Sequence, residues 1–357
     1  MTFASNVGSS TSHNYFVRLN RGEECSFRAR LKPVIRGRLN WRFRFSNSID
    51  STFASGAETR ANDMGGRFEI ISASANGVSI DWETRIAEPG CELRSIPTFI
   101  AAEDYIEFTW RLRALENDTI LPATPDHRTL SYISRDGGEF IREDTVCLPD
   151  FFEAERDISV KMTFIGDSIT QGCGTNVDAF EQWAARIAYT IDSKIAVHNI
   201  GLGYGRGRDA ATDGAWLKKA KEADIVNVCF GVNDLYQCEC GATLESDLRR
   251  IVTALHSADH PIRVILFTIP PFDMTGKEEA RRREVNAAIL SEGLGADGVF
   301  DVGKILARVA PNDNLAIYGG HPNGEGGKKL AEAYLLLHSS TIAAHSPAAD
   351  SSRPNIR

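Results

Sequence analysis

The chain has 357 residues, of which 42% are hydrophobic and 25% charged, a globular composition long enough for two domains. Its net charge of −8 and its pI of about 5.6 disfavour a nucleic-acid partner, and its apolar runs are shorter than the roughly 20 residues that cross a bilayer. The seven cysteines lack framework spacing, and the first residues lack the basic and apolar parts of a secretory signal. These features predict free thiols and a cytoplasmic protein.

The first part of the chain, residues 1–155, shows the period-two alternation of half-buried strands. Apolar residues alternate with polar ones at Leu39, Trp41, Phe43 and Phe45, and again at Ile106, Phe108, Trp110 and Leu112. The pair Asn76-Gly77 supplies the positive φ angles of a tight hairpin. These patterns predict an all-β sandwich or jelly-roll domain.

A row of arginines occupies the alternate positions Arg36, Arg38, Arg42 and Arg44. One face of a strand carrying four guanidinium groups could bind an anionic ligand. Rows of surface charge are more commonly solvated and paired with acids, so we favour that interpretation.

From residue 156 to 342, short apolar runs alternate with helical stripes, as in a parallel sheet covered by helices. Asp178 and Glu181 are spaced as a capping box before the first long helix, while Trp183 and Trp216 are expected in the core. The tail 343–357, rich in Ser, Ala and Pro, is expected to be disordered. The predicted strands are 162–165, 196–200, 225–229, 264–268 and 299–302.

Reactive groups in such a sheet collect beyond the carboxyl ends of its strands. After the first strand comes Gly166–Gly172 (GDSITQG), and after the second comes the glycine loop Asn199–Gly205. Gly231–Asp234 (GVND) follows the third strand, and Gly319–Gly324 (GGHPNG) precedes the last helix. A serine hydroxyl becomes a nucleophile when an imidazole within hydrogen-bond reach takes its proton, and Ser168 and His321 are candidates for this pair.

These four blocks, in this order, resemble the SGNH (GDSL) hydrolase superfamily over about residues 158–340. The resemblance implies a five-stranded α/β/α sandwich with the flavodoxin-like SGNH fold. It also implies Ser168 as nucleophile and His321 as base. The implied oxyanion hole consists of the Ser168 N–H, an N–H in the Gly203 region and the Asn233 side chain, with Gly205 as the alternative to Gly203.

The sequence departs from the family pattern at Tyr318, where the family usually has the aspartate that orients the histidine. The nearest upstream carboxylate, Asp313, lies eight residues before His321 and is expected to be out of reach. We therefore predict a Ser168-His321 dyad. Asp167 and Asp234 are expected to hold their loops in shape.

A β-sandwich ahead of an SGNH domain with a weakened acid is similar to the two-domain deacetylases of carbohydrate esterase family two. This resemblance implies short-chain acetyl esters of carbohydrate as substrates, a first domain that forms one wall of the cleft or docks the sugar, and no cofactor. An acyltransferase using the same serine, or a carbohydrate-binding protein with an inactive hydrolase domain, remains an alternative. The oligomeric state is not determined by the sequence.

Two other patterns are weaker. The loop Gly201-x-Gly203-x-Gly205-x-Gly207 lacks the G-x-G-x-x-G spacing of a dinucleotide site. Cys238-x-Cys240 has no second pair, so thiols are favoured over a metal site.

Overall fold

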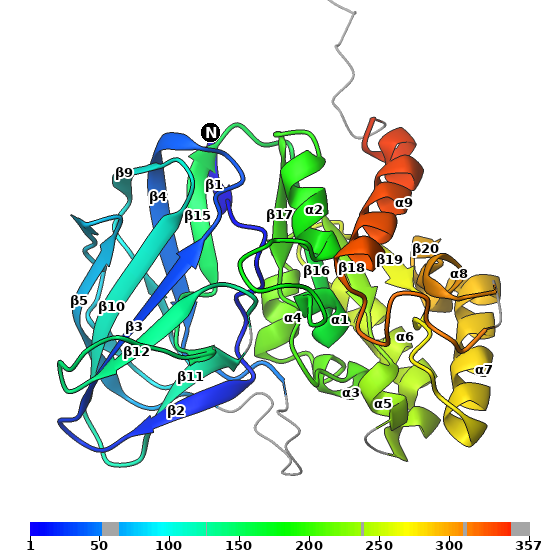
Figure 1. Ribbon diagram of the computed structural model, residues 1–357, viewed down its shortest axis with the longest axis horizontal. Coiled ribbons are helices and arrows are strands. Elements are labelled where there is room, and N and C mark those ends of the chain that lie inside the picture. Colours follow the sequence, from blue (N-terminus) through cyan, green and yellow to red (C-terminus); the bar gives the residue numbers. More distant parts are fainter. Residues whose placement is uncertain (52–63, 126, 237–238, 310–312, 344–357) are drawn as a thin grey trace, which may run out of the picture.

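The computed structural model describes residues 1–51, 64–125, 127–236, 239–309 and 313–343. An antiparallel β domain at the N-terminal side lies beside an α/β domain (Figure 1). The predicted disordered tail falls, beyond residue 343, outside the described residues. None of the described helices is long and apolar enough to cross a membrane.

The β domain is built from short antiparallel strands in three sheets of the described chain, ordered β1-β15-β4-β8 with β9 on β4, β13-β12-β3-β10-β5-β6 with β7 on β5, and β14-β11-β2. The strands are β1 (Thr2–Ser5), β2 (Tyr15–Leu19), β3 (Glu24–Leu31), β4 (Gly37–Ser46), β5 (Phe68–Ala75), β6 (Val78–Ser79), β7 (Ile86–Ala87), β8 (Glu92–Arg94), β9 (Thr98–Ala102), β10 (Ile106–Ala114), β11 (Thr119–Pro125), β12 (Ser131–Arg135), β13 (Ile141–Arg142), β14 (Thr145–Val146) and β15 (Phe151–Arg156).

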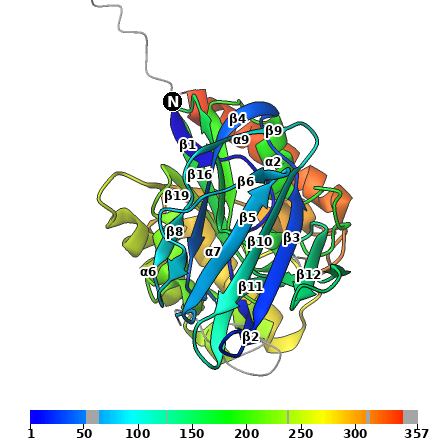
Figure 2. The same cartoon turned by 90° about the vertical axis from the view of Figure 1, so that its left-hand side faces the viewer.

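The core of the β domain follows from the alternation in its sequence. Buried and half-buried residues alternate along the whole of β10, and β3 shows the same period. The buried sets of the facing sheets meet in a cluster rich in aromatic rings, in which Phe108 lies 4.9 Å from Phe43 and 5.6 Å from Phe152 between ring centroids. Strands β5, β10 and β3 present their other face at the front of Figure 2.

The predicted hairpin is present between β5 and β6. Asn76 and Gly77 form its turn with φ angles of 47° and 76°, the left-handed conformation that favours this residue pair.

The α/β domain has a parallel sheet in the order β17-β16-β18-β19-β20, which confirms the predicted flavodoxin-like arrangement. Its strands are β16 (Val160–Gly166), β17 (Ile195–Asn199), β18 (Ile225–Cys229), β19 (Arg263–Phe267) and β20 (Gly298–Phe300). Its helices are α1 (Ser168–Gln171), α2 (Trp183–Thr190), α3 (Gly207–Ala210), α4 (Ala215–Ala220), α5 (Val232–Tyr236), α6 (Leu244–His256), α7 (Gly276–Glu292), α8 (Val302–Leu306) and α9 (Gly324–Ala343), with 3₁₀ turns at Glu239–Ala242 and Gly293–Gly295.

Helices cover both faces of this sheet. One core cluster includes α4, α6 and α7, and the other includes α2, α8 and α9. Trp183 and Trp216 are buried in these clusters, as predicted. The predicted capping box is wrong, because α2 begins at Trp183 with Gln182 at its N-cap. Asp178 instead accepts from Arg30 and Tyr105 of the β domain, so a contact between domains replaces the local cap.

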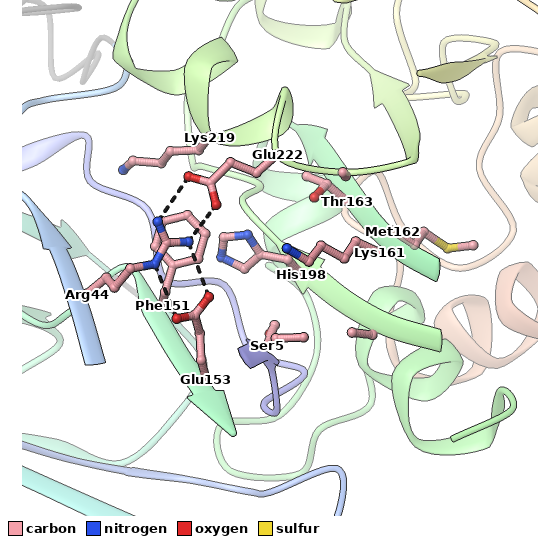
Figure 3. Close-up of a pocket in the computed structure, with 13 residues that line it drawn as sticks. Ser5, Arg44, Phe151, Glu153, Lys161, Met162, Thr163, His198, Lys219 and Glu222 are labelled. Atoms are coloured by element: carbon pink, nitrogen blue, oxygen red, sulfur yellow. Dashed lines mark hydrogen bonds and ion pairs between the residues drawn. The ribbon is translucent and has the colours of Figure 1, made fainter. Parts of the chain in front are cut away.

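Arg36, Arg42 and Arg44 of the arginine row pair with acids, as expected, but Arg44 is not solvated. Arg44 is 4% exposed and lies over the ring of Phe151 at the interface between the domains. Its guanidinium donates to Glu153 of β15 and, at 2.6 Å, to Glu222 beside α4 (Figure 3). The alternation along one strand could not predict that Arg44 is buried, because the second domain covers it.

A second ionic contact crosses the same interface. Lys219 of α4 is buried, and its ammonium lies 2.6 Å from Asp50 and also pairs with Asp150, both in the β domain. His13 contacts Asp150 as well, with 3.2 Å between His13 Nδ1 and Asp150 Oδ1. His13, Asp50 and Asp150 have the chemistry of metal ligands, but here their carboxylates are paired with the Lys219 ammonium.

Candidate active site

Ser168 lies at the sharp turn between β16 and α1. Gly166 ends the strand where a Cβ would come within 2.4 Å of the Cys229 carbonyl oxygen, so a side chain there would clash with backbone. Asp167 caps the helix, its Oδ1 accepting from Ile169 N at 2.9 Å. The turn places Ser168, the first residue of the helix, at the carboxyl edge of the sheet.

His321 reaches Ser168 from the loop before α9. Ser168 Oγ and His321 Nε2 are 2.8 Å apart, which is hydrogen-bond distance. Gly174 has a φ of 95° and packs against the His321 backbone, where a Cβ would lie 2.5 Å from the carbonyl oxygen. The His321 ring also meets the Phe272 ring edge-on, with centroids 5.1 Å apart. Contacts on two sides therefore hold the imidazole toward the serine.

Two further segments bring the predicted oxyanion donors to the same place. Gly203 and Asn233 both line the pocket that contains Ser168 and His321. Asn233 Nδ2 donates to Gly205 O at 3.0 Å, which links α5 to the glycine loop. Gly205 N donates to Leu202 O at 3.1 Å, and a Cβ on Gly205 would strike the Trp216 ring at 2.7 Å. Gly203 lines the pocket, whereas the alternative Gly205 is not among its lining residues.

The two acidic neighbours of the motif are buried and bonded to backbone N–H groups. Asp234 accepts from Gly207 N at 2.9 Å and from Arg208 N at 3.4 Å, holding the start of α3. Burial raises the pKa of Asp167 to about 7 and that of Asp234 to about 6. Both positions suit a role in shaping loops.

The pocket has a volume of about 550 Å³ and a mostly apolar wall. Sequence reasoning missed five of its lining residues: Pro125, Gln171, Cys173, Tyr236 and Phe272. Gln171 and Cys173 lie in or beside the GDSITQG block, and Phe272 follows the carboxyl end of β19, so the strand-end rule applied to every strand would have found them. Pro125 belongs to the β domain and gave no local signal. Its carbonyl accepts from Gln171 Nε2 at 2.9 Å, so the β domain forms part of one pocket wall.

Tyr318 and Asp313, the residues at which the sequence departs from the family pattern, lie in the chain that precedes His321 and α9. Tyr318 is half-buried, and its carbonyl oxygen accepts from Asn323 N at 3.1 Å. Asp313 Oδ1 accepts from Leu315 N at 2.9 Å, a contact within its own loop.

Cys238 and the side chain of Cys240 lie outside the described residues. The described cysteines Cys25, Cys91, Cys147, Cys173 and Cys229 are free thiols.

A serine, an imidazole base and pocket-lining amide groups at the carboxyl edge of a flavodoxin-like sheet define a carboxylic ester hydrolase. Residues 164–329 match the GDSL-like lipase/acylhydrolase family, so this part of the chain is a GDSL-like lipase/acylhydrolase domain. No curated protein matches the sequence.

Some of the solved structures similar to the chain cover about half of it, and others cover most of it. A lipolytic protein of the G-D-S-L family from Desulfitobacterium hafniense DCB-2 is 23% identical, covering 50% of this chain and 98% of its own, with a TM-score of 0.40. A family two carbohydrate esterase from Clostridium thermocellum, in complex with cellohexaose, is 12% identical over 96% of this chain and 99% of its own, with a TM-score of 0.41. A family 2 carbohydrate esterase from Corynascus thermopiles (Myceliophthora fergusii) is 13% identical, covering 94% of this chain and 99% of its own, with a TM-score of 0.42.

Proposed function

We propose that the protein is a serine esterase that removes short acyl groups, chiefly acetyl, from carbohydrate through a Ser168-His321 dyad and an acyl-enzyme. The observation that carries the proposal is the 2.8 Å contact between Ser168 Oγ and His321 Nε2 at the pocket. His321 Nε2 takes the Ser168 proton while Oγ attacks the ester carbonyl, and the imidazolium then protonates the leaving alcohol. In the second half, His321 activates a water that releases the acid and restores the serine.

The oxyanion of each tetrahedral intermediate is assigned to three donors: the Ser168 N–H, the Gly203 N–H and the Asn233 amide. Each preorganised donor aimed at the developing charge contributes about 3 kcal/mol to the stability of the transition state. The bond from Asn233 to Gly205 O supports this assignment, because it fixes the orientation of the amide before substrate arrives.

The dyad part of the proposal rests on how the imidazole is held. Phe272 and the Gly174 backbone fix the position of His321, while Asp313 is engaged with Leu315 N in its own loop. Tyr318 stands where an aspartate would otherwise supply a negative charge. A carbonyl oxygen can select the imidazole tautomer, but it stabilises the cation less than a carboxylate does.

The substrate class is argued from the rim of the pocket. Tyr204 and Tyr236 are 41% and 63% exposed and line it together with Phe272. Gln171 and Asn233 add amide groups near the serine. Exposed aromatic rings beside amides suit an alcohol that has both C–H faces and hydroxyl groups, as a sugar does.

The free thiols of the described chain favour a cytoplasmic location.

The test is a substrate panel with Ser168→Ala as the control. Acetyl esters of p-nitrophenol and of xylo-oligosaccharides should be hydrolysed with a higher kcat/KM than p-nitrophenyl octanoate, and mass spectrometry should find an acetyl group on Ser168 after rapid quenching. A preference for the octanoate would replace this function with a lipase-like one. Acetylation of an added sugar in place of acetate release would indicate an acyltransferase. Absence of turnover with every ester would indicate a binding protein.

A further inference from the structure

The segment from Asn6 to Asn14 runs between the two domains and is buried along its whole length. In Figure 1 it is the dark blue chain that leaves β1 and passes beside the parallel sheet. Ser10 forms a parallel bridge with Asn199, the last residue of β17, and its hydroxyl donates to Gly201 O. Asn14 Nδ2 donates to Gly203 O. Two residues of this segment thus contact the end of β17 and the glycine loop of the active site.

The carbonyl that Asn14 holds lies at the centre of a tight turn. Gly205 N donates to Leu202 O at 3.1 Å, and Tyr204 has a φ of 61°, which is the pattern of a type II turn with Gly203 and Tyr204 in the middle. A type II turn differs from a type I turn chiefly in the direction of its central peptide, here the one between Gly203 and Tyr204. The positive φ is disfavoured for tyrosine, so the turn needs an outside contact to select this form.

Asn14 is well placed to supply that contact. It is 1% exposed, and its backbone N–H donates to Ala123 O at 3.2 Å where β2 and β11 begin to pair. The same strand β11 ends at Pro125, which lines the pocket and accepts from Gln171. Asn14 is not among the residues that line the pocket, so it acts on the reaction through the loop and not by touching substrate.

We propose that Asn14 is a positioning residue that locks the Gly203-Tyr204 peptide and thereby sets the oxyanion loop for catalysis. The proposal rests on the proposed function, because it gives the Gly203 N–H a role in the transition state. Without the Asn14 amide, the Gly203-Tyr204 peptide can reverse, which turns the Gly203 carbonyl and the Tyr204 N–H and changes the backbone of Gly203 next to its own N–H. Both residues line the pocket. The β domain is then a working part of the active site.

The test compares Asn14→Ala and Asn14→Asp with a matched control, Thr11→Val. Thr11 lies in the same buried segment, but its hydroxyl donates to Asp150 O of the β domain and lies 3.4 Å from His198 Nε2 in β17, so it does not contact the turn at Gly203. Each Asn14 variant should lower kcat for p-nitrophenyl acetate about 10- to 100-fold with KM within about threefold, because an oxyanion donor acts mainly in the transition state. Thr11→Val should keep kcat within about threefold, since a lost buried hydrogen bond by itself acts on stability.

Two readouts separate positioning from a general loss of structure. A buried carboxyl group has a raised pKa and donates a hydrogen bond when protonated, so the kcat of Asn14→Asp relative to wild type should rise as the pH falls, while that of Asn14→Ala should not. Amide hydrogen exchange of residues 199–207 should be faster in Asn14→Ala than in wild type and in Thr11→Val.

The proposal is overturned if Asn14→Ala matches Thr11→Val both in kcat and in the exchange of the loop. A different result, in which wild-type protein hydrolyses no ester, refutes the proposed function and leaves the exchange measurement to decide whether Asn14 holds the loop. Unchanged exchange in that case also refutes the role of Asn14.

Discussion

The buried ion pair of Lys219 with Asp50 and Asp150, between the two domains, should stabilise the folded protein by several kcal/mol. Lys219→Met keeps the length of the side chain and removes the ammonium from between Asp50 and Asp150, all three groups being at most 4% exposed. Burial would raise the pKa of Asp150, but His13 and Lys219 hold it below its usual value. Breaking a buried pair by removing one partner costs about 3–5 kcal/mol, because a charge stays buried without compensation. We expect that loss in the free energy of unfolding at pH 8.

The control is Lys221→Met, two residues along the chain. Lys221 pairs with Asp213 at side-chain exposures of 22% and 45%, so its loss should cost less than about 1 kcal/mol. Calorimetry and urea unfolding of both variants measure the difference, and the domains of Lys219→Met should unfold at more widely separated temperatures than those of wild type.

The stability lost in Lys219→Met should depend on pH, in a direction set by the pKa values of the two carboxyl groups. A carboxyl group whose pKa is lowered on folding adds stability above its unfolded pKa, and that stability is lost as the pH falls through the folded value. This rule applies to Asp150, whereas burial raises the pKa of Asp50 even though the Lys219 charge acts to lower it. Removing Lys219 takes away an influence that lowers the pKa of both carboxyl groups, so both protonate at higher pH, and the difference in unfolding free energy between Lys219→Met and wild type should narrow on acidification. Equal stability of the Lys219→Met and Lys221→Met variants at pH 8 would refute the reasoning.

Three further predictions concern Ser168, His321 and the carboxyl groups near them in the fold or the sequence. Ser168→Ala should lower kcat by at least about 10³-fold with an unchanged thermal midpoint, and a folded variant that still turns over p-nitrophenyl acetate would show that Ser168 is not the nucleophile. His321→Ala should be nearly inactive, whereas Asp313→Asn should stay within about tenfold of wild type; a thousandfold loss in a folded Asp313→Asn would replace the dyad with a triad. Asp167 has its pKa raised to about 7 by burial, so the folded protein binds a proton more tightly than the unfolded chain and loses stability as the pH rises from about 4 to 7. Asp167→Asn should recover up to about 4 kcal/mol of the stability that the wild-type protein loses as the pH rises. The unfolding temperature of this variant should therefore exceed that of wild type by more at pH 8 than at pH 5. An equal difference at the two pH values would mean that Asp167 does not titrate in this range.

The sequence determined the two architectures because burial on one or both faces of a strand leaves a periodic signature. The strict alternation through β10 predicted a half-buried strand, and the mostly apolar run at Ile225–Cys229, interrupted only by Asn227, predicted a strand of a sheet covered by helices. The same logic located Ser168, because a parallel sheet exposes reactive groups at the carboxyl ends of its strands. His321 lies 153 residues away and was found only through its motif.

What the tertiary structure decided concerns contacts between segments distant in the chain. The capping box failed because Asp178 meets Arg30 of the other domain, and only the packed structure places Gly205 against Trp216 and Gly203 at the pocket. Arg44 is buried only because the second domain covers it. Asn14 carries no local signal at all: its amide matters because folding brings it to a carbonyl 189 residues away. Periodicity records which face of an element is buried, whereas the partner that buries it is fixed only when the domains pack together.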